Sequence, residues 1–223
     1  MSVVVGVIPA AGYASRMSGL AGSKEMVSLG GAPVIDYLLD RMFHAADEVV
    51  VITRPEKEDV AEHVRRRGSR VVEGHPSSVS ESLRLGLHGL DACDVVLLGF
   101  PDTIWEPEHG FVQLVRSLEK SEVALGVFES EEPERSDVVT LDGERVVSVD
   151  VKPTAPDSTL IWGCAAARTS ALAGLDRHNE PGYLFDELAG EGRGRVRAVP
   201  FSGGMIDIGT DEALAQARTL LGE

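Results

Sequence analysis

The hydrophobic positions in the first half of the chain alternate between two periods. Short, nearly continuous apolar runs predict buried strands at residues 3–8, 48–53, 69–73, 94–98 and 122–128. Apolar residues at helical spacing lie between these runs and predict helices over residues 34–43, 55–67, 79–90 and 108–120. Strands that alternate with helices are typical of βα units, which form a mainly parallel sheet with right-handed crossovers.

The pattern changes after residue 128. Two strand-like runs, residues 136–140 and 145–151, flank an Asp142-Gly143 turn and predict a β-hairpin. Short strands are expected at residues 159–167, 195–200 and 205–208, short helices at 169–176 and 183–189, and a closing helix at 210–221 with Thr210 as its N-cap. Since no repeat or linker divides the chain, we expect one α/β domain over residues 1–223, with the hairpin as an insertion.

Composition narrows the class of protein. The chain is 43% hydrophobic and 26% charged, as is ordinary for a soluble globular protein, and no window of about 18 residues is uniformly apolar. We therefore expect no membrane span, and the N-terminal pattern, which lacks a leader signature, favours a cytoplasmic protein. A net charge of −15 argues against a nucleic-acid partner, so an anionic substrate needs local positive charge. Two cysteines without CxxC spacing and six scattered histidines argue against a transition-metal site.

The loop after the first strand is the first candidate for chemistry. The strand breaks at Pro9 into small residues and leads to two separated cations, Arg16 and Lys24. Small residues such as Ala11 and Gly12 let a ligand approach the backbone, and Arg and Lys of different reach suit a polyphosphate. The loop contains neither a Walker A motif nor a GxGxxG motif. A tight strand-to-helix turn explains the same small residues, and both interpretations stay open.

Three acids and one lysine are the other candidates. Asp102 follows the fourth strand, where open α/β sheets hold ligands or magnesium, although this position taken alone favours an Asp that caps the next turn. Asp207 stands alone between isoleucines and needs a cation, a metal or backbone donors. Asp150 and Lys152 are expected on one face of a strand, either at a site or as an exposed ion pair.

Together these segments resemble sugar-phosphate nucleotidyltransferases, the nucleotide-diphospho-sugar pyrophosphorylases, and among them the glucose-1-phosphate thymidylyl- and uridylyltransferases. The motifs occur in family order along nearly the whole chain: Pro9-Ala10-Ala11-Gly12-x-x-x-Arg16-Met17 with Lys24, Gly99-x-x-Asp102, Asp150-Val151-Lys152-Pro153 and Ile206-Asp207-Ile208-Gly209-Thr210. The resemblance implies a three-layer α/β/α Rossmann-like fold with a mixed, mostly parallel sheet. It also implies a nucleotide-binding part at about residues 1–128 and a sugar-phosphate-binding part at about residues 129–223.

The resemblance implies a role for each motif residue. The nucleotide would lie on Ala10, Ala11 and Gly12, with Ser80 and Ser82 near its base and ribose. The catalytic cations would be Arg16 and Lys24, the sugar phosphate would bind Lys152 and Asp150, and Asp102 and Asp207 would bind Mg²⁺. An oxygen of the sugar 1-phosphate would attack the α-phosphorus of an NTP in line and expel pyrophosphate. Because the attacking oxygen is already anionic, no general base is required.

Departures from the family pattern leave alternatives open. Ala10-Ala11 replaces the usual Gly-Gly, and Ser23-Lys24-Glu25 replaces a Pro-Lys-Pro type segment. The Ala-Ala-Gly form, with Ser78-Val79-x-x-Ser82, also resembles the cytidylyltransferases of isoprenoid synthesis, which act on another phosphorylated alcohol. A catalytically inactive relative that binds a nucleotide or nucleotide sugar is a third interpretation, although both cations and both aspartates are present. The base, the acceptor, a homo-oligomeric state, and a metal contact by Glu25 or Asp150 all stay open.

Overall fold

The protein is described by a computed structural model that covers residues 2–13, 22–92, 94–192 and 194–221. The strands of its main sheet are β1 Val4–Pro9, β4 Glu48–Thr53, β5 Arg70–Glu73, β6 Val95–Gly99, β8 Val123–Glu129, β9 Val138–Asp142, β10 Arg145–Asp150, β11 Leu160–Arg168 and β12 Val196–Pro200. Two small sheets contain β2 Ser28–Leu29, β3 Ala32–Pro33, β7 Thr103–Trp105 and β13 Met205–Asp207. The helices are α1 Val34–Phe43, α2 Glu58–Arg66, α3 Val79–Gly86, α4 Gly110–Ser117, α5 Pro181–Gly190 and α6 Asp211–Leu221, with 3₁₀ turns η1 Lys24–Met26, η2 Pro133–Arg135 and η3 Thr169–Arg177.

The main sheet is mixed, as expected. Its strand order is β5-β4-β1-β6-β11-β8-β12-β10-β9. The first four strands of this sheet along the sequence, β1, β4, β5 and β6, pair in parallel, as the alternation of strands and helices predicts. The fifth, β8, does not lie beside β6, because β11 inserts between them and pairs antiparallel with both. The predicted hairpin forms from β9 and β10, with Gly143 in its turn at φ +61°.

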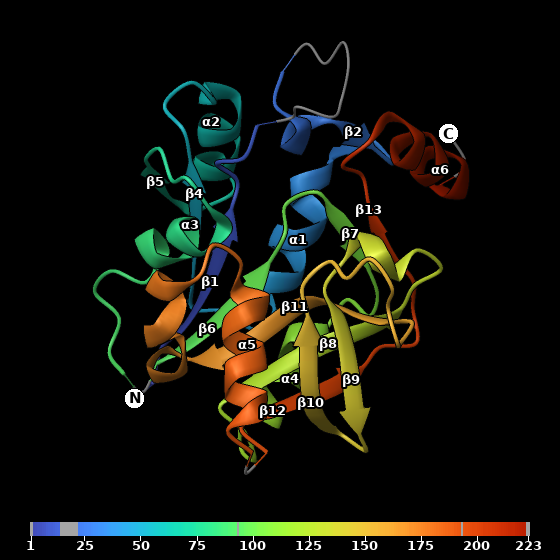
Figure 1. Cartoon of the computed structure of the whole chain (residues 1–223). Coiled ribbons are helices and arrows are strands. Elements are labelled where there is room, and N and C mark those ends of the chain that lie inside the picture. The colour runs from blue at the N-terminus through green and yellow to red at the C-terminus, as the bar shows by residue number, and fades with distance from the viewer. Residues whose placement is uncertain (1, 14–21, 93, 193, 222–223) are drawn as a thin grey trace.

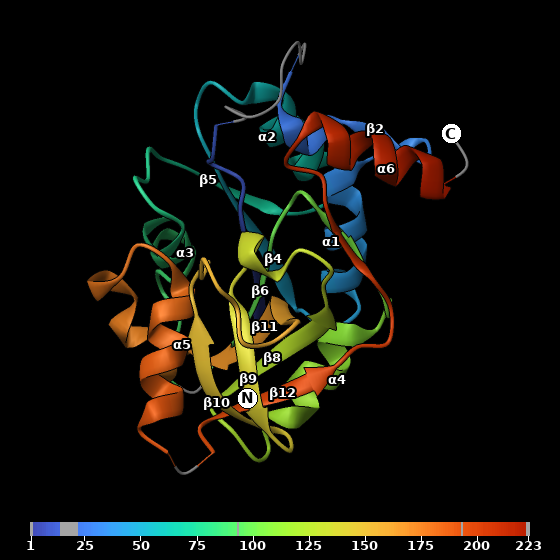
Figure 2. The ribbon, with the colours of Figure 1, turned by 45° about the vertical axis from the view of Figure 1, so that its right-hand side comes forward.

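Helices cover both faces of the sheet, which makes the three layers visible in Figure 1 and, turned, in Figure 2. One core joins α1, α2 and α4 to one face of the strands. The other core joins α3, η3 and α5 to the opposite face. A third, smaller cluster packs α6 against β2 and the chain around Ile208, at the edge of the molecule. No helix in the described ranges is long and apolar enough to cross a bilayer.

The predicted elements are present, with differences at their ends. Helix α1 and strand β4 have the predicted bounds, and the Thr210 hydroxyl accepts a hydrogen bond from the Ala213 N–H at 3.2 Å, as an N-cap should. Helix α3 stops at Gly86, short of the predicted residue 90, and Gly89 beyond it adopts φ +87°. A residue in that conformation cannot continue a right-handed helix. The apolar residues that follow Gly86 keep helical spacing in the sequence although the helix has ended, and this is why the predicted helix was too long.

Candidate active site

One cavity of about 980 Å³ opens beyond the carboxyl ends of β1 and β6. Open α/β sheets place their ligands at this edge. Residues from both halves of the chain line the cavity, and seven of them belong to the predicted site: Ala11, Gly12, Lys24, Ser82, Asp102, Lys152 and Asp207. The structure therefore brings together residues that are up to 196 positions apart (207 minus 11).

A lysine and two aspartates form the centre of this cavity. Strand β13 pairs with β7 so that Asp207 faces Thr103, and the Ile208 N–H donates to the Asp102 carbonyl at 2.9 Å. The Lys24 ammonium forms a hydrogen-bonded ion pair with the Asp102 carboxylate, and both side chains are largely shielded from water. Burial lowers the pKa of Lys24, but Asp102, Glu25 and Asp207 outweigh this effect and raise the pKa above its ordinary value. Lys24 is therefore a permanent cation.

Asp102 and Asp207 suit a hard divalent cation. Mg²⁺ is commonly held by one or two carboxylates together with water and substrate phosphates, and not by a cage made entirely of protein. Within the described ranges, no group of three or more His, Cys, Asp or Glu side chains is arranged to hold a metal. Two carboxylates at the edge of an open cavity fit a metal that arrives with a phosphate ligand. Asp207 Oδ1 also accepts from the Gly209 N–H at 2.8 Å, which orients this carboxylate.

Some of the predicted nucleotide-binding residues line the cavity, and others are buried behind its lining. Ala11 and Gly12 line the cavity, whereas the buried Ala10 donates its N–H to the Ile52 carbonyl at 2.8 Å. Ser82 lines the cavity too, and Ser80 is fully buried below it. Neither serine hydroxyl has a hydrogen-bond partner among the described residues. Arg16 lies outside the described residues.

Two cations that the sequence analysis missed hold this loop in place. The Arg54 guanidinium donates to the carbonyls of Ala11 at 2.5 Å and Pro76 at 3.0 Å, and lies 4.2 Å from the centroid of the Tyr13 ring. Lys57 Nζ donates to the Ala10 carbonyl at 2.9 Å and to both carboxylate oxygens of Glu25, at 2.8 and 2.9 Å. Two features of the sequence could have drawn attention to these residues. Arg54 directly follows a predicted strand, and Lys57 is one of only four lysines in the chain.

Glu25 forms its ion pair with Lys57 away from the lining of the cavity. Its carboxylate is fully buried, and burial raises its pKa above the ordinary value although Lys57 opposes this effect. Glu25 is not among the residues that line the cavity. The arrangement favours a structural role for this acid.

The prediction that Lys152 shares a strand face with Asp150 was wrong. Strand β10 ends at Asp150, which is exposed and does not line the cavity. Lys152 lies beyond the strand with φ +45°, in the left-handed region, and this turn directs it to the cavity. Its ammonium donates to Glu180 Oε1 at 3.0 Å. The Asp-x-Lys spacing alone could not reveal the change of backbone conformation.

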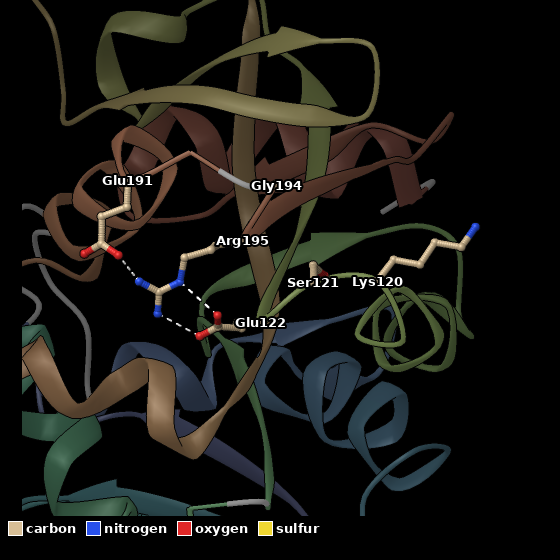
Figure 3. A pocket seen from close by; sticks show the side chains of 6 residues that line it. All are labelled: Lys120, Ser121, Glu122, Glu191, Gly194 and Arg195. Carbon is tan, nitrogen blue, oxygen red and sulfur yellow. Dashed lines mark hydrogen bonds and ion pairs between the residues drawn. The ribbon is translucent and has the colours of Figure 1, made fainter.

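A second hollow, of about 650 Å³, involves none of the predicted residues. Figure 3 shows its lining residues, Lys120, Ser121, Glu122, Glu191, Gly194 and Arg195. The Arg195 guanidinium donates to both oxygens of Glu122, at 2.9 and 2.7 Å, and also pairs with Glu191. Its positive charge is thus neutralised by two carboxylates, so we place the candidate site in the larger cavity.

Comparisons with known proteins identify the family and the fold of the chain. A family model described as a MobA-like NTP transferase domain matches residues 6–182. A relative from Sulfolobus acidocaldarius, provisionally named a mannose-1-phosphate guanyltransferase, is 25% identical over an alignment of 224 positions that covers 93% of this chain. The chain spans only about 60% of the length of that relative.

Two solved structures share the fold. One, from Bacillus anthracis, is provisionally named a glucose-1-phosphate thymidylyltransferase and was solved with a sucrose; it superposes with a TM-score of 0.82 at 19% identity, covering 98% of this chain and 95% of its own. The other is an inositol-1-phosphate CTP transferase from T. maritima, with a TM-score of 0.80 at 14% identity, covering 98% of this chain and 96% of its own. At these identities the likeness establishes the fold alone.

Proposed function

The chain belongs to the family of MobA-like NTP transferase domains, and from this membership we propose that it is a magnesium-dependent nucleotidyltransferase that makes a nucleotide sugar and pyrophosphate from an NTP and a sugar 1-phosphate. The observation that carries the proposal is the meeting of Lys24, Asp102, Asp207 and Lys152 in one cavity. Two cations and two carboxylates from four separate segments suit a reaction between two phosphate esters. We also propose that residues 1–128 chiefly bind the nucleotide and residues 129–223 the acceptor, within a single domain.

The nucleotide binds, in this proposal, along the loop that Arg54 and Lys57 hold. Ala11 and Gly12 let the triphosphate approach the backbone, and Lys24, together with Arg16, neutralises its negative charge. Lys24 is already charged beside Asp102, so binding requires only that its ammonium exchange one anionic partner for another. Ser82 lies near the base and ribose.

Asp102 and Asp207 hold the metal with the triphosphate. When bound there, magnesium supplies positive charge to the phosphate oxygens that gain negative charge during transfer. Lys152 holds the phosphate of the acceptor. One of its oxygens forms a bond to the α-phosphorus while the bond from that phosphorus to pyrophosphate breaks. The residues act by positioning and by neutralising charge, and none has to remove a proton.

A direct assay tests the proposal. Pyrophosphate release is measured with magnesium for five NTPs, including dTTP, against a panel of sugar 1-phosphates and other phosphorylated alcohols. We expect one strong combination. The Asp102→Asn variant should lose about 100-fold or more in kcat, while its unfolding free energy changes by only about 1 kcal/mol. Asp142→Asn, on an exposed strand end, is the matched control and should keep wild-type activity. Folded protein that binds an NTP but releases no pyrophosphate with any acceptor would favour the inactive relative.

A cytidylyltransferase that acts on another phosphorylated alcohol is the second candidate. The residues that suggest it, Ser78, Val79 and Ser82, all line the cavity, where they can contact the base. The same matrix separates the two candidates, because activity confined to CTP with an acceptor other than a sugar 1-phosphate would select the second.

A further inference from the structure

The acceptor end of the cavity holds two carboxylates on either side of a lysine. Asp137, Lys152 and Glu180 all line the cavity. The Lys152 ammonium donates to Glu180 Oε1 at 3.0 Å, and its backbone N–H donates to the Asp137 carboxylate. Of these three residues, only Lys152 belongs to a motif of the sequence analysis. The two acids therefore need their own explanation.

Asp137 is fixed in place by its neighbours. The indole N–H of Trp162 donates to Asp137 Oδ2 at 3.2 Å, and Trp162 is itself buried between Phe100 and Phe185. On the other side lies Gly182, in the first turn of α5, where an added Cβ would stand 2.4 Å from Asp137 Oδ2. These two neighbours restrict the positions that the carboxylate can adopt.

This placement is unfavourable for a carboxylate that has no ligand. Burial raises the pKa of Asp137 to about 6; Lys152 opposes the shift and the charge of Glu180 adds to it. A carboxylate can accept about four hydrogen bonds, and the Trp162 and Lys152 N–H groups supply two. Because Asp137 lines the cavity, a bound ligand can supply the remaining hydrogen bonds. Costly groups of this kind are concentrated at functional sites.

We propose that Asp137 and Glu180 accept hydrogen bonds from hydroxyl groups of the acceptor while Lys152 binds its phosphate, so that the site selects a polyhydroxylated phosphate ester. The assignment rests on the proposed function, which requires a phosphorylated acceptor at this end. Ionised carboxylates repel a phosphate and accept hydrogen bonds, so they suit a donor group of the acceptor, and the hydroxyl groups of a sugar phosphate are such donors. An acceptor with few hydroxyls would remove water from both carboxylates without replacing its hydrogen bonds, and sites of this design reject such analogues strongly.

The Asp137→Asn variant is the principal test. Asparagine keeps the shape and an oxygen for the Trp162 N–H, but it replaces one accepting oxygen by an NH₂ donor. We expect KM for a polyol phosphate to rise about 10-fold or more, because a hydrogen bond to a charged group is lost, while KM for the NTP stays within about 2-fold. The penalty should disappear for the acceptor analogue that lacks the bound hydroxyl. Glu180→Gln should act in the same way on a different hydroxyl.

A second variant displaces the carboxylate without changing charge. Gly182→Ala puts a methyl group 2.4 Å from the present position of Asp137 Oδ2, too close for both to stay, so it should reproduce the rise in acceptor KM. Asp142→Asn, at the other end of β9, is the matched control and should leave both KM values unchanged. Thermal unfolding of each variant checks that the protein remains folded.

Calorimetric titration of the whole protein with polyol phosphates, without NTP, separates this inference from the proposed function. Binding that weakens in Asp137→Asn supports the inference, even if no combination of substrates releases pyrophosphate and the proposed function fails. Three outcomes would overturn it. The first is that polyol phosphates do not bind the wild-type protein. The second is that neither Asp137→Asn nor Gly182→Ala changes acceptor binding. The third is that an aminoalkyl phosphate serves as acceptor better than any polyol phosphate.

Discussion

Lys152 combines a strained backbone with a proposed contact to substrate. Among the described residues, it is the one non-glycine residue with a positive φ, +45°. Such a conformation costs about 1 kcal/mol or more in a residue with a Cβ, and strain of this kind is often kept where function requires it. Here the turn directs a lysine into the cavity and its N–H to Asp137.

Lys152→Gly and Lys152→Ala therefore form an informative pair. Both remove the ammonium, so both should raise acceptor KM by about 10-fold or more. Glycine adopts this φ freely and alanine does not, so the glycine variant should be more stable than the alanine variant by about 1 kcal/mol. Urea unfolding measures the difference. Equal stabilities would show that the strain at this position is no larger than the entropic cost of fixing glycine in the folded chain.

The pKa of Asp137 predicts how stability depends on pH. Because the pKa is raised from 3.8 to about 6, the folded state binds this proton more tightly than the unfolded state. Ionisation therefore removes stability as pH rises from about 4 to 6, and the loss is complete above about 6. Asp137→Asn has no such loss. We expect its stability relative to wild type to increase across this window by up to about 3 kcal/mol, and then to stay constant.

Unfolding of both proteins in urea at intervals from pH 4 to 8 checks this expectation. The other titrating groups are shared, so the difference between the two curves isolates Asp137, with Lys152 and Glu180 as the charges that face it. A difference that does not vary with pH would contradict the raised pKa.

Site residues could be predicted from the sequence only where a pattern marked them. Lys24 was marked by the small-residue loop after the first strand and Asp102 by the end of the fourth strand, and both line the cavity. Asp137 lies at the start of a predicted strand and Glu180 among other polar residues, and no pattern marks either acid. Their positions at the cavity depend on Trp162 and on α5, which pack there only in the folded chain. Lys152 was found by its motif, but its backbone conformation was not.

At the scale of elements, the 3₁₀ turn η1 illustrates how a short segment is held. Its Glu25 is fully buried, and Lys57, just before α2, donates to both of its carboxylate oxygens and to the carbonyl of Ala10. The ion pair thus joins η1, the start of α2 and the end of β1 beneath the proposed nucleotide site. Burying a charge pair is favourable only while both partners are present.

Lys57→Met should therefore destabilise the protein by about 3 kcal/mol or more, because Glu25 is left buried without its cation. The double variant Glu25→Gln, Lys57→Met should lose less, since no charge remains buried. Lys120→Met, on the chain after α4, is the control and should change stability by less than about 0.5 kcal/mol. Urea unfolding measures all three. A loss in Lys57→Met no larger than in the control would show that the pair contributes nothing.

Element positions, the parallel pairing of the first four strands and the hairpin were predictable from periodicity, but the neighbours of β11 were not. Strand β11 is a continuous apolar run, which marks a buried strand but does not say which neighbours it has. Its place between β6 and β8 decides that the sheet is mixed. Likewise, the three-residue strands β7 and β13 were too short to predict as a pair, yet their pairing brings Asp207 close to Asp102.

At the scale of the whole molecule, the two halves of the chain are interleaved. Strand β11, from the second half, lies between β6 and β8 of the first, and β12 pairs with β8 on its other side. Removing residues 129–223 would therefore expose both edges of β8 and one edge of β6. The proposed nucleotide and acceptor parts share one sheet, and we expect neither to fold alone.

The two tryptophans allow a test of this cooperativity. Trp105 lies in the core beneath α1 and α4, and Trp162 lies in the core of the opposite face, beside α5. Trp105→Phe and Trp162→Phe each leave a single fluorescent reporter, one for each side of the sheet. If the halves unfold together, urea transitions followed by either tryptophan should coincide, after correction for the stability of each variant, with the transition followed by far-UV circular dichroism. Separate transitions in either variant would mean that the cores on the two faces of the sheet unfold independently, and the sheet would then not act as a single cooperative unit.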